Sequence, residues 1–248
     1  MSDDASLSYG ELAAWYDAIY DARSKDYAGE AAGLLELVRS GGSQPRSLLD
    51  VACGTGRHLE VFAGHLDDVA GLDNSTEMVI LAGERLGRDV TLHEGDLRSF
   101  DLGRTFDVVT CLFSSIGHVA DDEELDAAVA TMARHVGADG WLLIEPWLTP
   151  DRVDEGGRRD VVTAETQEGV VARVGSSHVD AGALVIEFGW AVASPAGVVT
   201  TQEHHRMPLF TQERYLEAVS RAGLVASWYD DLPALGDRRG LLVGRREG

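Results

Sequence analysis

The sequence has little of several features that define large protein classes. Only two cysteines occur among 248 residues, Cys53 and Cys111, and both fall inside expected core strands, which favours buried thiols over a disulfide framework. No apolar run approaches the ~18 residues that span a bilayer, and the first residues show no charged segment followed by an apolar one. We therefore expect a cytoplasmic protein that does not enter a membrane.

Positive charge is also scarce. The chain has 21 basic and 42 acidic residues, a formal net charge of -21, and Lys25 is its only lysine. No cluster of basic residues interleaved with aromatic ones occurs, so we exclude nucleic acid as a partner. A small anionic substrate would still need arginines near strand ends or in an insertion, and the candidates are Arg152, Arg158, Arg159, Arg206 and Arg239.

The segment of residues 48–56, with the sequence LLDVACGTG, carries the strongest functional pattern. An apolar, strand-like run contains Asp50, the residues Gly54 and Gly56 follow, and a helical stretch comes next. A dinucleotide loop has a third glycine where this chain has Leu59, and the carboxylate of Asp50 would repel a pyrophosphate. The same carboxylate suits a cofactor with a sulfonium and an ammonium group. The pattern predicts that Asp50, Gly54 and Gly56 bind S-adenosylmethionine.

Polar residues follow the next three expected strands. Residues 69–73 end in Asp73, whose two oxygens can accept hydrogen bonds from both hydroxyls of a ribose. Residues 90–93 are followed by Asp96, which can accept a hydrogen bond from the amino group of adenine. The fourth strand, residues 106–113, runs into a Ser-Ser-Ile-Gly-His segment. Taken alone, each carboxylate is more often a solvated loop residue or a helix cap than a ligand. Together they favour a cofactor site, because ligands of open α/β sheets lie beyond the carboxyl ends of the strands.

The remaining pattern predicts the fold class. With this length the chain can bury about 75% of its unfolded surface in one α/β domain. Helical spacing of apolar residues predicts an N-terminal cap of two helices, and alternating polarity between turn residues predicts about four antiparallel strands at residues 160–210. We expect an α/β protein with a doubly wound, Rossmann-like, seven-stranded sheet and an antiparallel β insertion after the fifth strand.

This organisation divides the chain into three expected segments. Residues 1–147 hold the helical cap and the S-adenosylmethionine-binding core, residues 148–210 hold the insertion, and residues 211–248 hold the last helix and a closing strand pair. The insertion must bury one face, either as a wall over the site or against a second copy of the chain. His204 and His205 lie within it, but adjacent strand residues point to opposite faces, so we expect no metal site.

Several motifs together resemble a known family. They are residues 48–56, 111–118, 145–147, 205–206 with 209–211, and 239–241. This set resembles the S-adenosylmethionine-dependent N,N-dimethyltransferases of TDP-3-amino sugars in the desosamine and mycaminose pathways, and the likeness covers most of the chain. The first motif marks class I methyltransferases in general, and the others are more specific. The resemblance implies methyl transfer to a small-molecule amine, most directly a TDP-linked amino sugar, by a homodimer whose insertion makes dimer contacts.

The resemblance also implies the site residues. Those that match substrate contacts are Tyr16, Ser114, His118, Trp147 and Arg239, and those that match cofactor contacts are Gly54, Asp73, Asp96 and Leu97. Histidine, with an ordinary pKa near ~6.5, can accept the amine proton, so we assign His118 as the catalytic residue. A hydrogen-bonding role for His118 fits equally well. Glu145 is a third candidate, although its place also suits a structural hydrogen bond.

Other functions keep the same cofactor motifs. A methyltransferase acting on the oxygen or nitrogen of another small metabolite is one alternative, although attack by a hydroxyl needs a stronger base or a metal ion, and no metal-ligand spacing is visible. A non-catalytic protein that binds S-adenosylmethionine is another. Residues 148–159 match the family poorly, which leaves the nucleotide open.

Overall fold

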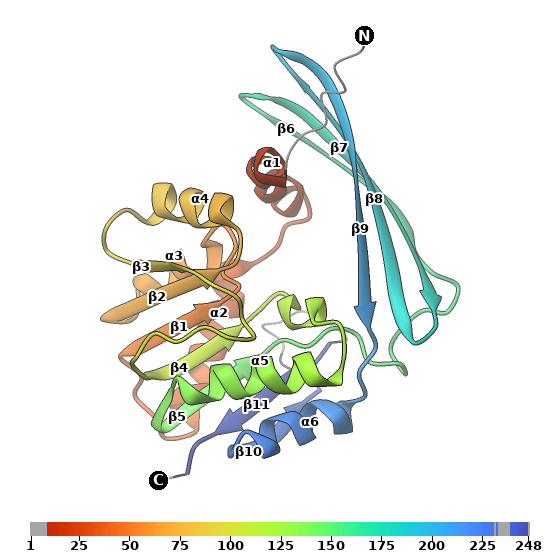
Figure 1. The fold of residues 1–248 in the computed structure, drawn as a ribbon. Helices are drawn as coiled ribbons and strands as arrows, with labels where there is room; N and C mark the ends of the chain where they lie inside the picture. The colour runs from red at the N-terminus through yellow and green to blue at the C-terminus, as the bar shows by residue number, and fades with distance from the viewer. Residues whose placement is uncertain (1–8, 231, 233–238, 248) are drawn as a thin grey trace. The chain divides into compact units, whose positions relative to one another are not determined.

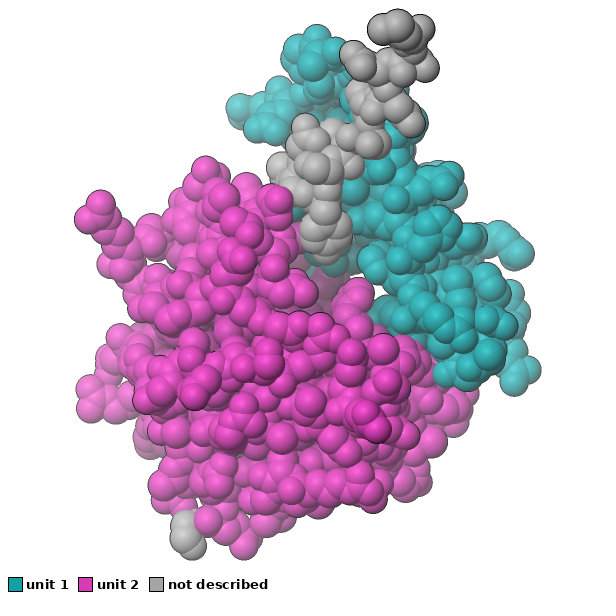
Figure 2. Space-filling model, viewed as in Figure 1, with its two compact units in different colours: residues 1–25, 153–207 teal, residues 26–152, 208–248 magenta. Residues whose placement is uncertain are grey.

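The computed structural model describes residues 9–230, 232 and 239–247 (Figure 1). They form two compact units (Figure 2). Unit 1 contains the chain up to Lys25 together with Val153–Met207, and unit 2 contains Asp26–Arg152 and the chain from Pro208 onward. The two units are described separately below.

Unit 2 is built on a seven-stranded sheet in the order β10-β11-β5-β4-β1-β2-β3. The strands are β1 (Ser47–Val51), β2 (Asp68–Asp73), β3 (Thr91–Glu94), β4 (Phe106–Cys111), β5 (Val136–Ile144), β10 (Val225–Tyr229) and β11 (Leu241–Arg245). The pairs β1–β2, β2–β3, β1–β4 and β4–β5 are parallel, whereas β11 runs antiparallel to both neighbours. The order reverses between β1 and β4, which is where open α/β sheets bind ligands. The predicted doubly wound sheet is confirmed.

Helices cover both faces of this sheet (Figure 1). On one face α5 (Asp122–Arg134) and α6 (Gln212–Arg221) bury residues such as Met132 and Val219. On the other face α2 (Tyr27–Ser40) and α3 (Arg57–Ala63) bury residues such as Leu34 and Phe62. The fifth helix of this unit, α4 (Thr76–Leu86), contacts β2 and β3. Strands enclosed in this way are apolar almost throughout, which is why their pattern is continuous and not alternating.

Apart from α3, which follows Gly56, the α-helices of unit 2 begin at side chains that accept backbone hydrogen bonds. Ser75 accepts from the backbone nitrogen of Met78 at the start of α4. Asp121 caps α5 and Thr211 caps α6 in the same manner. Each such cap contributes about 1 kcal/mol of helix stability. These caps set the positions at which α4, α5 and α6 start.

Unit 1 combines α1 (Tyr9–Ala22) with a four-stranded sheet in the order β6-β7-β8-β9. The strands are β6 (Arg159–Thr166), β7 (Gly169–Asp180), β8 (Ala183–Ser194) and β9 (Gly197–Pro208), and the β6–β7 and β7–β8 pairs are antiparallel. Leu12, Trp15 and Ile19 of α1 form one core with Val171 and Trp190 of the sheet. The expected N-terminal cap is therefore divided, because α1 groups with the insertion and α2 with the large sheet. The apolar stripe of α1 covers a sheet face that would otherwise meet water.

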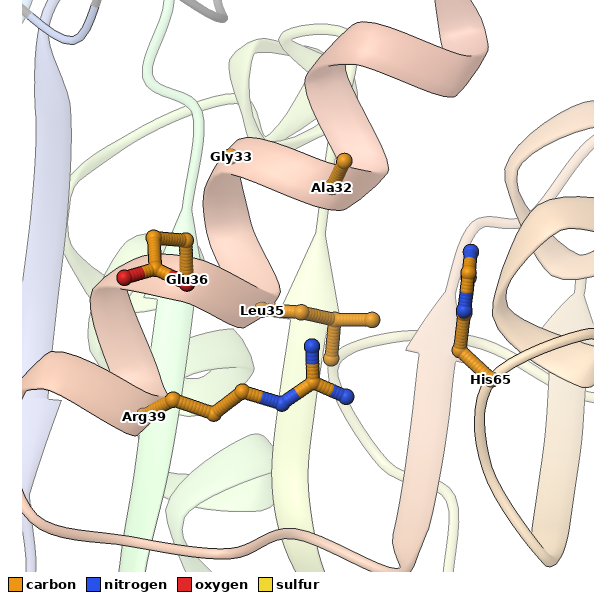
Figure 3. Close-up of a pocket in the computed structure, with 6 residues that line it drawn as sticks. All are labelled: Ala32, Gly33, Leu35, Glu36, Arg39 and His65. Atoms are coloured by element: carbon orange, nitrogen blue, oxygen red, sulfur yellow. The ribbon is translucent and has the colours of Figure 1, made fainter.

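A hollow of 410 Å³ lies beside α2 (Figure 3). It is lined by Ala32, Gly33, Leu35, Glu36, Arg39 and His65. Since α2 leads into β1 and His65 precedes β2, the hollow lies at the edge where these strands begin. It is therefore distinct from the carboxyl ends of the strands.

No helix within residues 9–230 or 239–247 is long and apolar enough to cross a membrane.

Candidate functional site

The loop after β1 has an unusual backbone. Ala52, Gly54 and Gly56 all have positive φ angles, of 57°, 54° and 79°. A Cβ atom at Gly56 would lie 2.9 Å from a methyl carbon of Leu86, whereas one at Gly54 would meet nothing within 4 Å. Gly56 thus lets α3 pack closely against α4. The backbone at Gly54 is open to a ligand.

Asp73, the last residue of β2, ties this loop to its neighbour. Its Oδ2 accepts from the backbone nitrogen of Gly54 at 2.8 Å, and its Oδ1 accepts from that of Ser75 at 3.0 Å. The residue is 7% exposed, and burial raises the pKa of its carboxyl group. Each carboxylate oxygen can accept a second hydrogen bond. The geometry therefore leaves Asp73 able to bind two hydroxyl groups.

Asp50 is buried in β1 at 2% exposure. The hydroxyl of Thr110 donates to its Oδ1 at 2.6 Å, but burial outweighs that bond and raises the pKa of the carboxyl group to about 6. The folded chain therefore holds this proton more tightly than the unfolded chain. The free energy of unfolding falls as the pH rises from roughly 4 to 6, by roughly 3 kcal/mol in all. Such costs are typical of functional sites, and a bound cation would reduce this one.

Asp96 follows β3 in a more open place. Arg98 donates to both of its oxygens, from Nε to Oδ1 at 2.8 Å and from NH2 to Oδ2, and these bonds lower the pKa of the Asp96 carboxyl group. Arg98 also donates to Glu124 on α5 at 2.7 Å. Leu97 packs against the adjacent core. The carboxylate is thus held in place at the strand end, with lone pairs left for another donor.

The end of β4 is strained and is held by the end of β5. Phe113 and Ser114 have φ angles of 56° and 61°, a conformation that costs non-glycine residues about 1–2 kcal/mol each. Glu145 offsets this cost, because its Oε2 accepts from the backbone nitrogen of Phe113 at 2.6 Å. The Ser114 hydroxyl donates to the carbonyl oxygen of Pro146 at 2.9 Å. Glu145 therefore makes the structural hydrogen bond that its position suggested.

Arg239 completes a cluster at these two strand ends. Its NH1 donates to Oε1 of Glu145 at 2.8 Å and to the Ser114 hydroxyl at 3.1 Å. Its guanidinium carbon lies 5.5 Å from the centre of the Trp147 ring. Among the described residues no acceptor binds the buried Nε1 of Trp147. A guanidinium fork and an indole N–H here suit a ligand rich in anionic oxygens.

The structure brings Ser114, Trp147 and Arg239 together at the ends of β4 and β5. His118 ends the short 3-10 helix η1 (Ser115–His118), and its side chain is exposed. Tyr16 lies on α1 in unit 1, with its ring centre 4.7 Å from that of Tyr20.

Two of the other arginines considered for an anion pocket are engaged elsewhere. Arg152 pairs with Asp230. Arg206 pairs with Asp180 at an exposed place in unit 1, with its NH1 2.8 Å from Oδ2 of that carboxylate. Arg239 is thus the candidate that the strand ends of unit 2 support.

Comparison with known proteins decides the family. A model described as a methyltransferase domain matches residues 48–140. The chain is 43% identical over 239 residues to the dTDP-3-amino-3,6-dideoxy-alpha-D-glucopyranose N,N-dimethyltransferase of Streptomyces fradiae. The alignment covers 95% of this chain and 91% of that relative. The chain belongs to the amino-sugar N-methyltransferases. Its cofactor is S-adenosylmethionine, as in the solved complex of an amino pentose methyltransferase of this group.

Two further members of the amino-sugar N-methyltransferases are similar over nearly the whole chain. The dTDP-4-amino-2,3,4,6-tetradeoxy-D-glucose N,N-dimethyltransferase of Saccharopolyspora spinosa is 39% identical over 246 residues, covering 99% of this chain and 97% of that relative. The crystal structure of Streptomyces venezuelae DesVI is 40% identical with a TM-score of 0.84, covering 96% of this chain and 98% of that one. The predicted family, fold and cofactor are confirmed.

The residues at the carboxyl ends of β1 and β2 fit this cofactor. Gly54 leaves open space where a ligand can approach, Asp73 has lone pairs for a ribose, and Asp50 is a buried carboxylate that favours a nearby cation. An acidic set of this kind would repel a pyrophosphate. Sequence reasoning missed Thr110, which holds Asp50. The available signal was a threonine near the end of β4, a strand whose other residues apart from Asp107 are apolar.

Proposed function

We propose that this enzyme transfers methyl groups from S-adenosylmethionine to the amine of a TDP-linked amino sugar and forms the dimethylamine. The observation that carries the proposal is the contact of one Arg239 nitrogen with both Glu145 and Ser114 at the ends of β4 and β5. In a chain of net charge -21 an anionic diphosphate needs a local cation. Arg239 supplies that cation, and Trp147 adds an N–H donor. The names of the related enzymes support the sugar and the number of methyl groups.

The cofactor residues in this proposal are Asp50, Gly54, Gly56, Asp73, Asp96 and Leu97. When bound, S-adenosylmethionine would supply an electrophilic methyl group on a sulfonium: an uncharged amine would bond to the methyl carbon as its bond to sulfur breaks, and the thioether S-adenosylhomocysteine would leave. Asp73 holds the ribose hydroxyls and Asp96 holds the adenine amino group. Asp50 faces the cationic end. Holding the two reactants in line supplies most of the rate enhancement, because it replaces a bimolecular encounter.

His118 is the residue that we propose as the proton acceptor. Most of the substrate amine is protonated at neutral pH, and one proton must leave before attack. The imidazole of His118 is exposed at the end of η1, four residues beyond Ser114, so it can receive that proton and release it to solvent. Tyr16 stays a predicted substrate contact.

Replacing His118 with asparagine is expected to lower kcat by about tenfold to a hundredfold and to flatten the acid limb of the pH profile. The reason is that asparagine can hydrogen-bond the substrate but cannot take its proton. Steady-state rates between pH 5.5 and 9 measure both effects. The matched control is His65→Asn, since His65 is exposed beside the hollow at the opposite edge of the sheet. An acid limb that stays in place would assign His118 to positioning instead.

The experiment that tests the substrate is a mass-shift assay. Purified enzyme and S-adenosylmethionine are offered TDP-linked 3-amino and 4-amino sugars, the same amino sugars without the nucleotide, and a panel of unrelated small amines. The proposal expects a gain of two methyl groups on a TDP-linked compound and little turnover of the free sugar. Turnover of an unrelated amine alone would favour another small metabolite. Binding of S-adenosylmethionine with no turnover of any compound would favour a non-catalytic role.

The sheet of unit 1 supports a homodimer. One of its faces packs on α1. Its strands also carry exposed valines that are not part of that core: Val161 is 65% exposed, Val170 42%, Val174 58% and Val198 73%. Val161 and Val174 are directly paired across β6 and β7. A second copy of the same sheet would cover such a patch by two-fold symmetry.

Sedimentation velocity at micromolar concentration is expected to show a dimer. Val174→Arg is expected to shift the equilibrium toward monomer by at least tenfold, because it would bury a charge in the proposed contact. Val225→Arg is the matched control, since Val225 is 50% exposed on β10 of unit 2. A monomeric wild-type chain, or equal effects of the two variants, would contradict the dimer.

A further inference from the structure

The inner face of α2 contains one carboxylate. The other buried residues of this helix, Tyr27, Ala31, Leu34, Leu35 and Val38, are apolar or aromatic, whereas Glu30 is 7% exposed and stands in their midst. A buried carboxylate destabilises the fold unless it is paired. The position of Glu30 therefore calls for a specific partner.

That partner is His58. Its Nε2 lies 2.8 Å from Oε2 of Glu30, and it is 6% exposed. His58 is the second residue of α3 and follows the cofactor loop, which ends at Gly56. The edge of the Tyr27 ring packs against the imidazole with the ring centres 5.0 Å apart. Glu30 thus holds the His58 ring, and with it the first turn of α3, in one orientation.

The same imidazole acts on Asp50. A positive charge on His58 lowers the pKa of the Asp50 carboxyl group against the larger effect of burial, and the Thr110 hydrogen bond lowers it further. Asp73 acts in the opposite sense. The adjacent thiol of Cys53 is neutral, because burial raises its pKa well above the ordinary value.

Two further groups border these residues. Burial raises the pKa of the Cys111 thiol beyond the range in which it ionises. On the outer side, the Arg57 guanidinium carbon lies 4.8 Å from the centre of the Tyr27 ring. His58 is therefore the cation of this set that acts on Asp50.

We propose that Glu30 and His58 are positioning residues that keep Asp50 ionised for the cationic end of S-adenosylmethionine. The Glu30 carboxylate lies 2.8 Å from Nε2 of His58, so it fixes the orientation of the imidazole and favours a positive charge on it. Without the pair, Asp50 would be a buried carboxylate close to Asp73 with only a hydroxyl for support, and it would hold its proton at higher pH. The inference rests on the proposed cofactor role of Asp50.

The test is the pH dependence of S-adenosylmethionine binding, measured by titration calorimetry without any methyl acceptor between pH 5 and 8. In the wild-type enzyme the dissociation constant is expected to rise as the pH falls through about 6, where Asp50 takes up its proton. The double variant Glu30→Gln/His58→Gln replaces the ion pair with two neutral amides, which avoids an unpaired buried charge. The acid limb of this profile, where the dissociation constant rises as the pH falls, is expected about half to one pH unit higher in the double variant. The affinity at pH 8 should be nearly unchanged.

Two controls isolate the effect. His135→Gln removes another buried histidine of unit 2, whose Nδ1 lies 2.8 Å from the carbonyl oxygen of Thr131, and should leave the limb in place. In an Asp50→Asn background the limb should vanish, and adding the double variant should change nothing further. Thermal unfolding confirms that each variant is folded.

An unmoved limb in a folded double variant, or an equal shift in His135→Gln, would overturn the inference. Where the double variant does not fold, Glu30→Gln alone carries the test, with a shift in the same direction expected. Failure of the wild-type chain to bind S-adenosylmethionine would overturn the proposed site itself. Normal binding with an unmoved limb would overturn this inference alone.

Discussion

Replacing Arg239 with methionine is expected to lower kcat/KM for a TDP-linked amino sugar by about a hundredfold while the dissociation constant of S-adenosylmethionine changes less than twofold. Arg239 makes its contacts to Glu145 and Ser114 at the ends of β4 and β5, whereas the glycine loop proposed for the cofactor follows β1. Its loss removes charge-assisted bonds to the diphosphate. It also leaves the 3%-exposed Glu145 without its cation, so substrate binding suffers twice. Steady-state kinetics and calorimetry measure the two effects separately.

Arg239→Lys sharpens this prediction. Lysine keeps the charge but cannot reach Glu145, Ser114 and an anion at once, because it lacks the planar fork. Kinetics intermediate between wild type and Arg239→Met are expected. The assignment would be wrong if both variants bound the sugar nucleotide as the wild type does, or if S-adenosylmethionine binding fell in parallel.

Removing the carboxylate of Asp73 is the second large effect that we expect. In Asp73→Ala the affinity for S-adenosylmethionine should fall about tenfold to a hundredfold, which corresponds to lost charged hydrogen bonds worth ~1.5 to 3 kcal/mol. The loop should loosen as well, because the backbone nitrogens of Gly54 and Ser75 lose their acceptor. Titration calorimetry measures the affinity, and chemical denaturation measures the stability.

Asp67→Ala provides the control for this variant. Asp67 lies immediately before β2, whereas Asp73 ends it, so the two substitutions act at opposite ends of one strand. Asp67 is exposed and pairs with Arg46 at 2.8 Å, an interaction worth less than about 1 kcal/mol. Unchanged S-adenosylmethionine affinity in folded Asp73→Ala, or an equal loss in Asp67→Ala, would refute the ribose contact.

The sequence was sufficient to predict the large sheet and the ends of its strands. Parallel strands covered on both faces leave continuous apolar runs, and the residues just after them face one edge of the sheet. Asp73 could be assigned to that edge because it directly follows such a run. Ser114, Trp147 and Arg239 were found through the resemblance. Their spacing along the chain does not indicate that they lie close together.

Contacts between distant residues could not be predicted in this way. Phe113 and Glu145 are 32 positions apart, and neither a positive φ angle nor the bond that stabilises it leaves a local pattern. The partner of α1 was also hidden, because an amphipathic helix shows that it has an apolar side but not which sheet covers it. Glu30 and His58 are 28 positions apart, and only the fold reveals that they meet.

One measurement tests the central claim most directly. The purified enzyme and S-adenosylmethionine are incubated in parallel with a TDP-linked 3-amino sugar and with its 3-hydroxy analogue, which differ at the reacting atom alone. Mass spectrometry follows the products. We predict that the amino compound gains one and then two methyl groups while the hydroxy compound stays unchanged. Methylation of the hydroxy compound alone, or of neither while an unrelated amine is turned over, would contradict the account.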